Sequence, residues 1–374
     1  MKKRTILISI LLVSALFLGS VSAAGGDAGD PLISLDYLTN VFRPAAEKAA
    51  LEKLDAAEKA VYAAAETQWR AVAAAGEAAA GSSRAARWTE ARLKKGDVLS
   101  GLTGAQVMLL AGEGSVRFTA GAVVDVTEGT ELQSGAALAA LHRYLVAEDT
   151  TALFTVDSRT AVVEYCGDYH ITPSTATPDY NAMASALKTL SLFWGTDTAY
   201  GEGFDLEVGP TRIQALIMLI RLLGEEDAAL ACTAPSPFSD IAENYWGYRY
   251  LAYAYEKGYT NGVEDNKFAP DRPANAGMYT EFVLRALGYS DTSQHDISTA
   301  AERAYTAGVV TAGERAALQA GGFLRADVVY LSWYALGVPI SGSSTALHQK
   351  LEASGVFSAD AYRSAQALVT SARL

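Results

Sequence analysis

The sequence predicts an α+β multidomain protein, and three observations support this fold class. An alanine-rich stretch from about residue 37 is typical of one long helix, and short apolar runs from residue 93 onward are typical of strands. The last half of the chain contains an internal repeat of helical segments. A chain of 374 residues is long enough for two or three domains, each with its own hydrophobic core.

The N-terminus has the pattern of a cleaved signal peptide over residues 1–24. Residues 2–4 are basic, the run from Ile6 to Leu18 is apolar, and the small residues 21–23 suit a signal peptidase. This apolar run is too short to span a bilayer as a helix, and no later segment of the sequence has a transmembrane pattern. The sequence therefore predicts a secreted protein without a transmembrane segment in its mature chain.

Charge and cysteine content exclude several classes of protein. With 42 acidic and 30 basic side chains, the net charge of -12 argues against a nucleic-acid partner. Two cysteines, Cys166 and Cys232, are too few for a four-thiolate zinc site or a disulfide scaffold. After export they could still form one disulfide between the β region and the repeats, provided that the fold brings them together.

Residues 37–92 are predicted to form one long helix. Its larger apolar residues recur mostly at spacings of three and four, and charged residues occupy the positions between them. Such a helix could be a coiled-coil spacer, could bind a partner or a second copy of the chain, or could pack on its own domain. The stripe consists of Leu51, Leu54, Val61, Tyr62, Ala65, Trp69 and Val72.

Residues 93–172 are predicted to form a small all-β sandwich or roll. Six short apolar runs are separated by Gly, Asp and Ser, which is the spacing of strands and turns in such folds. The runs are Gln106 to Leu110, Val116 to Phe118, Ala122 to Val126, Arg143 to Val146, Ala152 to Val156 and Ala161 to Tyr165.

The sequence predicts no catalytic, cofactor-binding or metal-binding residue. Glycoside hydrolysis needs two carboxylates at a defined separation, and the sequence alone does not show any two of the β region's carboxylates facing each other. These carboxylates are Asp125, Glu128, Glu131, Glu148 and Asp149. The histidines have no second His or Cys at the spacing of metal ligands. They are His142, His170, His295 and His348.

The internal repeat consists of three helical segments that end in Leu-Gly and align without gaps. Thr211 and Asn275 stand where an N-cap is needed, and glycine follows each helix as in a C-cap. Arg212 and Arg325 each lie 12 residues before the final glycine, where the middle copy has Ala276. The three segments are residues 211–224, 275–288 and 324–337.

The middle copy is the most complete. It contains Phe238-Ser239-Asp240, Trp246, a glycine-bounded turn at 258–262 and Phe268-Ala269-Pro270 before its second helix. In these motifs it resembles the S-layer homology family. The unit of that family reads Phe-x-Asp, a Trp-bearing helix, a Gly-bounded turn, Phe-x-Pro, and Thr-Arg-Ala-Glu opening a second helix that ends in Leu-Gly. The resemblance extends over about residues 180–374.

The resemblance implies three units, at about residues 180–230, 238–290 and 295–340, followed by a C-terminal helix. In the family, three units form a pseudo-threefold all-α assembly whose grooves hold anionic, often pyruvylated, cell-wall polysaccharide. An arginine at a helix N-terminus, backed by free backbone amides, suits a carboxylate on such a sugar. The implied function is therefore non-catalytic anchoring to a wall polymer, either a secondary polysaccharide or another polymer linked to peptidoglycan.

The implied polysaccharide-binding residues are Arg212, Arg325, Asp240, Trp246 and Asp327. The two arginines would bind a carboxylate, Asp240 would bind sugar hydroxyls or brace a groove, and Trp246 would pack at or under it. Asp327 keeps the acidic position of the family motif, which is Gln214 and Met278 in the other copies. The alternatives are a helix-terminal salt bridge for each arginine, a core position for Trp246 and a helix cap for Asp240.

The sequence thus predicts a secreted cell-envelope protein that attaches non-covalently to anionic wall polysaccharide and displays a β domain at the surface. Ala276 replaces the arginine of the middle copy, so at most two of the three grooves are competent. One alternative is a secreted enzyme that acts on wall sugars through the β domain. Another is a structural surface protein whose degenerate repeats bind no polymer.

Overall fold

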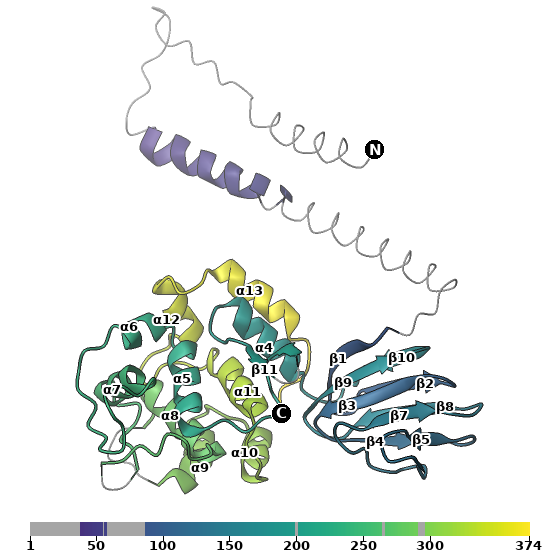
Figure 1. Ribbon diagram of the computed structural model, residues 1–374. Coiled ribbons are helices and arrows are strands. Elements are labelled where there is room, and N and C mark those ends of the chain that lie inside the picture. The colour runs from purple at the N-terminus through teal and green to yellow at the C-terminus, as the bar shows by residue number, and fades with distance from the viewer. Residues whose placement is uncertain (1–37, 55, 58–86, 199–200, 264–265, 291–295) are drawn as a thin grey trace, which may run out of the picture. The chain divides into compact units, whose positions relative to one another are not determined.

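The computed structural model describes residues 38–54, 56–57, 87–198, 201–263, 266–290 and 296–374 (Figure 1). The predicted signal peptide and much of the predicted long helix lie outside these ranges. The chain divides into two compact units, Met1–Arg84 and Ala85–Leu374, and each is described by itself. No helix in the described ranges has the length and apolarity needed to cross a membrane.

In the first unit, a π-helical turn, η1 (Leu38–Phe42), precedes α-helix at residues 43–54 and 56–57. Alanine favours this helix, as does an i,i+4 ion pair of 2.8 Å between Arg43 Nε and Glu47 Oε1. The apolar residues in this stretch are solvent-exposed, which leaves them accessible to another surface. The large ones are Val41, Phe42, Leu51 and Leu54.

In the second unit, residues 89–172 form two antiparallel sheets (Figure 1). One sheet has the strand order β1-β9-β3-β7-β5-β6, and the other has the order β10-β2-β8-β4. The strands are β1 (Thr89–Lys94), β2 (Val98–Leu102), β3 (Gln106–Ala111), β4 (Gly114–Arg117), β5 (Val123–Asp125), β6 (Thr130–Glu131), β7 (Arg143–Val146), β8 (Thr151–Val156), β9 (Thr160–Cys166) and β10 (Tyr169–Thr172).

The core of this β domain lies between the two sheets. Alternate residues of β3 are buried, including Val107 and Leu109, because successive side chains of a strand point to opposite faces. They share one hydrophobic cluster with Leu99 of β2 and Phe154 of β8, which belong to the other sheet. The apolar run predicted at Gln106 to Leu110 thus lies in a strand of which one face is buried in the core.

Strand β1 corrects the prediction of a helix that extends to residue 92. Each residue of β1 pairs with β9, from Thr89 opposite Tyr165 to Lys94 opposite Thr160. Leu93 is buried in the same core. Sheet pairing and burial here outweigh the local helix propensity of a charged, alanine-containing stretch.

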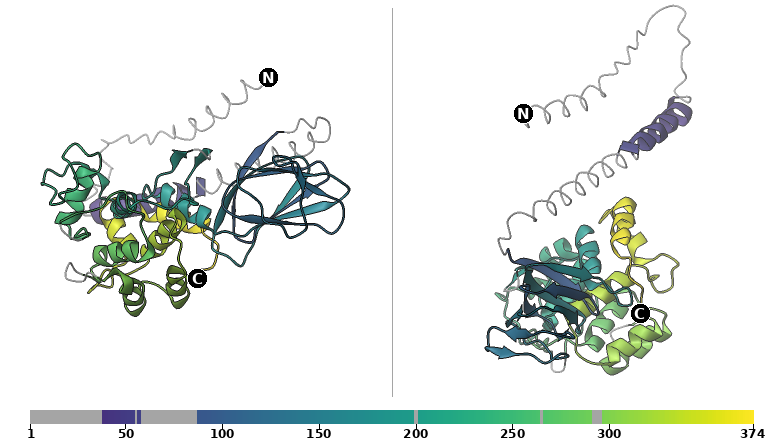
Figure 2. Two further views of the ribbon diagram at one scale, coloured as in Figure 1. Left: turned by 60° about the horizontal axis from the view of Figure 1, so that its bottom comes forward. Right: turned by 90° about the vertical axis from the view of Figure 1, so that its right-hand side faces the viewer.

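Residues 180–374 form a helical region with one small hairpin (Figures 1 and 2). The helices are α4 (Tyr180–Thr189), α5 (Arg212–Leu222), α6 (Glu226–Leu230), α7 (Tyr248–Glu256), α8 (Ala276–Ala286), η2 (Ile297–Thr299), α9 (Ala300–Thr306), α10 (Ala312–Gln319), α11 (Arg325–Ala335), α12 (Leu347–Ala353) and α13 (Ala359–Leu368). The hairpin consists of β11 (Thr196–Thr198) and β12 (Gly201–Gly203).

Helices α5, α8 and α11 are the three repeated segments, and they contact one another in pairs. Thr211 caps α5 and Asn275 caps α8 through side-chain oxygens that accept backbone amides. Gly224 and Gly288 follow α5 and α8 with φ of 66° and 77°, a conformation that favours glycine. All three helices contribute to a single hydrophobic core of the helical region.

The disulfide considered between Cys166 and Cys232 is not formed, and both thiols are free. Cys166 is buried at the end of β9, where desolvation raises the pKa of its thiol. Cys232 packs against the core of the helical region, with its Sγ atom 3.9 Å from Glu256 Oε2. The cysteines thus belong to separately packed parts of the second unit.

Candidate functional site

The first junction is the contact between the start of α5 and the loop at residues 268–272. The amide of Arg212 donates to the Arg272 carbonyl at 2.8 Å, and the amide of Ile213 donates to the Pro270 carbonyl at 3.1 Å. The expectation of free helix amides beside Arg212 is therefore wrong. A neighbouring loop satisfies them, as buried backbone donors require.

Asp240 holds this loop in place. Its Oδ1 accepts the amide of Phe268 at 2.9 Å, and its Oδ2 accepts the amide of Ala269 at 2.8 Å. Asp240 does not cap the next helix, because the N-cap position of α7 is Gly247. The carboxylate thus braces the wall of the first junction from the side of the Phe-x-Asp motif.

The Arg212 side chain is buried, with 4% of its surface exposed. Its Nη2 donates to the Gly262 carbonyl at 2.9 Å, and the guanidinium lies 4.7 Å from the centroid of the Phe268 ring and 5.5 Å from that of Phe282. No described residue accepts a hydrogen bond from its buried Nε. Desolvation, together with the nearby charges of Arg272 and Arg285, lowers the pKa of Arg212 to about 10, so it remains a cation at neutral pH.

Arg212 lines a cavity of about 400 Å³ at the first junction. Two further arginines, Arg272 and Arg285, line it, and Glu281 is its one acidic residue. The remaining wall consists of the 260–263 turn and apolar side chains of Met278, Phe282 and Ile297. The cavity is therefore lined by more cationic than anionic groups.

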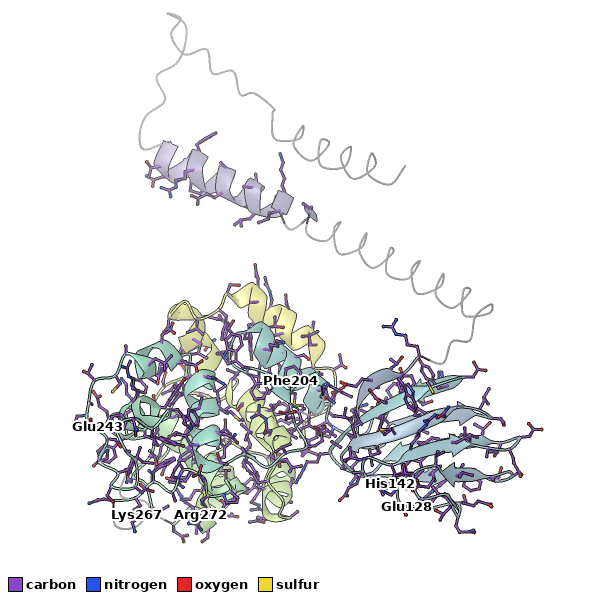
Figure 3. The ribbon with its side chains drawn as sticks, in the orientation of Figure 1. Glu128, His142, Phe204, Glu243, Lys267 and Arg272 are labelled. Carbon is purple, nitrogen blue, oxygen red and sulfur yellow. The ribbon has the colours of Figure 1, made fainter. Side chains whose placement is uncertain are left out.

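Glu281 is already neutralised by its neighbours. Its carboxylate is 2.8 Å from Arg285 Nε and 2.6 Å from Arg303 Nη2, and it also accepts from Ser290 Oγ at 2.7 Å. Arg272 differs from these residues because it is exposed and has no ion-pair partner within the described ranges. Figure 3 shows Arg272 and Lys267 at the same edge of the helical region. Among the cationic residues that line the cavity, Arg212 and Arg272 are therefore the ones available to an anion.

The second junction is the contact between the start of α11 and the loop at residues 204–208. The amides of Arg325 and Ala326 donate to the carbonyls of Val208 and Leu206 at 2.9 and 3.1 Å. The free amides expected beside Arg325 are therefore also absent. Arg325 is buried, and desolvation lowers the pKa of its guanidinium.

The guanidinium of Arg325 contacts two neighbouring phenylalanine residues. Its Nε donates to the carbonyl of Phe204 at 2.9 Å, and the group lies 5.5 Å from the ring centroid of Phe193. The carbonyl of Phe204, a residue labelled in Figure 3, thus accepts from the Nε of Arg325, whereas no residue that the structure describes accepts from the Nε of Arg212. Helix-terminal arginines in the same sequence context consequently have different hydrogen-bond states.

Asp327 caps helix α11 and forms an ion pair with the β domain. Asp327 accepts the amide of Leu324 at 2.8 Å, as a helix cap, and lies 3.1 Å from Arg159 Nε of the β domain. Desolvation raises the pKa of its carboxyl group.

Trp246 is not a core residue, since 63% of its surface is exposed. Gly247 beside it packs against Ile213 at the start of α5.

The structure therefore places Arg212, Asp240 and Trp246 around the first junction, while Arg325 and Asp327 lie at the start of α11. Sequence reasoning missed the cavity residues Arg272 and Arg285. Arg272 lies two residues after Pro270 of the Phe-x-Pro motif, so a search for cations beside that motif would have found it. The role of Arg285 depends on the ion pair with Glu281, for which its i,i+4 spacing was the available signal.

Two curated proteins are similar to part of this chain. The "Cell surface protein" of Thermoanaerobacter kivui is 34% identical over 121 residues, which cover 32% of this chain and 16% of that protein. Cell surface glycoprotein 1 of Acetivibrio thermocellus is 32% identical over 89 residues, which cover 24% of this chain and 4% of that protein. The chain thus spans less than a fifth of the length of each of these relatives.

Among solved structures, procruciferin, an 11S globulin from Brassica napus, aligns with 23% of this chain and 22% of its own at 12% identity. Its TM-score of 0.16 is too low to support any statement about the fold.

A family match is found for the middle copy, and it includes Asp240, Trp246 and the Phe-x-Pro motif. Residues 237–275 match the S-layer homology domain, which confirms the resemblance for this part of the chain.

Proposed function

We propose that this is a secreted cell-surface protein whose first junction binds a carboxylate-bearing cell-wall polysaccharide, without catalysis. The observation that carries the proposal is the buried Nε of Arg212, which has no partner among the described residues and belongs to a cavity lined by two more arginines. A buried donor without a partner is costly, so a ligand that accepts its hydrogen bond gains affinity.

A carboxylate fits this position better than a neutral hydroxyl. The guanidinium presents donors in a planar fork that matches the two oxygens of a carboxylate. Arg212 is held at its Nη2 by the Gly262 carbonyl and between two phenylalanine rings, so it loses little conformational freedom on binding. Arg272 at the exposed side adds attraction for an anionic polymer.

Trp246 supplies a surface for the neutral part of such a polymer. Its ring is exposed and lies 5.5 Å from that of Tyr245, so the pair forms an aromatic patch beside the start of α5. Aromatic faces are apolar and suit the C–H face of a sugar ring. The proposed ligand therefore spans the cavity and this patch.

The proposal extends the S-layer homology assignment from residues 237–275 to three related units over 180–374. Supporting it are the three 11-residue helices and the equivalent backbone contacts at two junctions. In this view Arg325 has become a structural residue, while Arg212 keeps the binding role. The relatives are named cell-surface proteins, which agrees with this location.

The enzyme alternative is weaker, because Asp125, the buried one of the five carboxylates considered, is held by structural partners. Asp125 Oδ2 lies 2.7 Å from His142 Nδ1, and Asp125 Oδ1 accepts the amides of Thr127 and Glu128. Burial would raise the pKa of Asp125, but these hydrogen bonds lower it overall, unlike in a general acid. Figure 3 shows His142 and Glu128 together at one edge of the domain.

The test is co-sedimentation of the chain without residues 1–24 with purified cell-wall sacculi. We expect Arg212→Gln to weaken binding by roughly tenfold or more, the usual scale for losing a buried charge-assisted hydrogen bond. Arg117→Gln, at an exposed arginine of β4, is the matched control and should bind like the wild type. Sacculi stripped of secondary polysaccharide should retain neither the wild type nor the Arg117→Gln control.

Binding that is the same for Arg212→Gln and the control would refute the assignment of the first junction. Retention on stripped sacculi would point to peptidoglycan itself as the ligand. Thermal unfolding of each variant is measured alongside, so that a loss of binding is assigned only to a folded protein.

A further inference from the structure

The two junctions with arginine follow one backbone rule. At the first junction the α5 amides bond the carbonyls of Arg272 and Pro270, three and five residues before the N-cap Asn275. At the second junction the α11 amides bond the carbonyls of Val208 and Leu206, three and five residues before the N-cap Thr211. Each helix start is thus joined to the loop that leads into another of the three helices.

The third junction, between the start of α8 and the 319–323 loop, departs from this rule. By the same count, Ala276 and Gly277 should donate to the carbonyls of Gly321 and Gln319, before the N-cap Leu324. Within the described ranges neither amide has such a partner, and Gln319 instead ends helix α10. A cavity of about 260 Å³ lies between the two sides.

On the loop side of the third junction, the β domain binds the carbonyl of Gly321 and that of its neighbour Gly322. Arg159, between β8 and β9, donates from Nη1 to the Gly322 carbonyl at 3.0 Å and from Nη2 to the Gly321 carbonyl at 3.5 Å. Its Nε lies 3.1 Å from Asp327 Oδ1. One guanidinium therefore contacts both the loop and the carboxylate that caps α11.

This arrangement parallels the other junctions. Arg212 reaches the Gly262 carbonyl and Arg325 reaches the Phe204 carbonyl, so each joins its helix start to a neighbouring loop through a guanidinium. Helix α8 begins with Ala276, so the first position of this helix has no guanidinium. Arg159 places one on the loop of that junction, although it comes from a strand connection more than 100 residues earlier in the sequence.

We propose that the β domain closes the third junction through Arg159 and is a docked component of the helical assembly, held in one orientation. The connection at residues 173–179 is also held on the β domain by two hydrogen bonds. Thr177 Oγ1 donates to the Lys95 carbonyl at 2.6 Å, and the amide of Ser174 donates to Asp97 Oδ1 at 2.7 Å. The guanidinium of Arg92 packs directly on Gly203 of the helical region's hairpin.

Removal of the Arg159 guanidinium has a definite physical consequence. The side chains of Arg159 and Asp327 are 27% and 14% exposed, so solvent screens their ion pair only partly. Truncation leaves a mostly buried carboxylate and two loop carbonyls without this donor. The loop at 319–323 then loses its attachment to the β domain, and the connection at 173–179 becomes the main tether.

The experiment compares the full chain with Arg159→Ala, Arg159→Lys and the exposed-arginine control Arg117→Ala. Hydrogen–deuterium exchange is followed in peptides covering 317–327 and, as an internal reference, 260–272 at the first junction. For Arg159→Ala we expect roughly tenfold faster exchange in 317–327 and unchanged exchange in 260–272, the pattern of a local opening. Limited proteolysis should cut the 173–179 segment sooner than in the control.

Exchange and cleavage identical to those of Arg117→Ala would overturn the proposal. If Arg159→Ala speeds exchange in every peptide, the Arg159→Lys variant distinguishes local opening from general destabilisation. Lysine keeps the charge beside Asp327 but lacks the planar fork that reaches both carbonyls. Faster exchange confined to 317–327 in Arg159→Lys supports the proposal, and unchanged exchange there overturns it. Sacculus binding through Arg212 should be retained in every folded Arg159 variant.

Discussion

The first and second junctions are built on the same backbone contacts and differ in what their arginines have left to donate. The buried Nε of Arg212 has no acceptor among the described residues, whereas the Nε of Arg325 is satisfied by the Phe204 carbonyl. The helices whose entry loops form these junctions also differ. Glu281 lies seven residues before Gly288, which ends the α8 segment at the first junction. The corresponding residue in α5, seven before Gly224, is Ile217. One repeated scaffold can thus support a polar cavity in one place and a closed structural contact in another.

The largest expected effect concerns Glu281, which distinguishes the polar junction from the apolar one. Glu281→Gln should lower the free energy of unfolding by about 3 kcal/mol, because it leaves Arg285 and Arg303 without their buried counter-charge. Ile217→Val, at the corresponding position, should cost about 1 kcal/mol. Urea unfolding of both variants measures the contrast, and equal losses would mean that the ion pairs add nothing to stability.

Arg325→Gln should separate a structural arginine from a binding one. It removes a buried donor from the Phe204 carbonyl, so we expect a loss of about 2 kcal/mol in unfolding free energy. Sacculus binding per folded molecule should stay within twofold of the wild type. A tenfold loss of binding, measured at a temperature where the variant is folded, would place the second junction among the polymer sites.

Trp246→Ala should weaken wall binding by about fivefold, which corresponds to about 1 kcal/mol for one aromatic contact. Because the ring is largely exposed, the melting temperature should barely change. Trp194→Ala is the matched control, because Trp194 is another tryptophan of the helical region with a half-exposed side chain. Equal binding by both variants would remove the aromatic patch from the proposed site.

The smallest expected effect belongs to Arg272, which is exposed at the rim of the first junction. Arg272→Gln should weaken binding about threefold at low salt, and the difference should vanish near 1 M salt, where charges are screened within about 3 Å. Buried Arg212 should retain its importance at both salt concentrations. Titration of sacculi at two ionic strengths checks this, and a salt-independent loss would mean that Arg272 binds the polymer directly.

Local patterns predicted many individual elements. The apolar run Gln106 to Leu110 corresponds to β3, and the segment 211–224 contains α5 with its Thr211 cap. Strand β1 was missed because its six residues are stabilised by β9, more than 60 residues away. The match to the S-layer homology domain confirms the motif reading for the middle copy, whereas the three-unit organisation remains a proposal.

The sequence by itself determined where the repeated helices begin, where apolar strands of the β domain lie, and that arginine opens two of the three repeated helices. These features depend on residues within a few positions of one another, so side-chain chemistry and periodicity are sufficient. Tertiary structure alone decided that both sets of helix amides are occupied, and that Arg325 Nε has an acceptor while Arg212 Nε has none in the described part of the chain. Hydrogen-bond partners such as Phe204 and Arg159 come from distant parts of the chain, and only packing brings them within bonding distance.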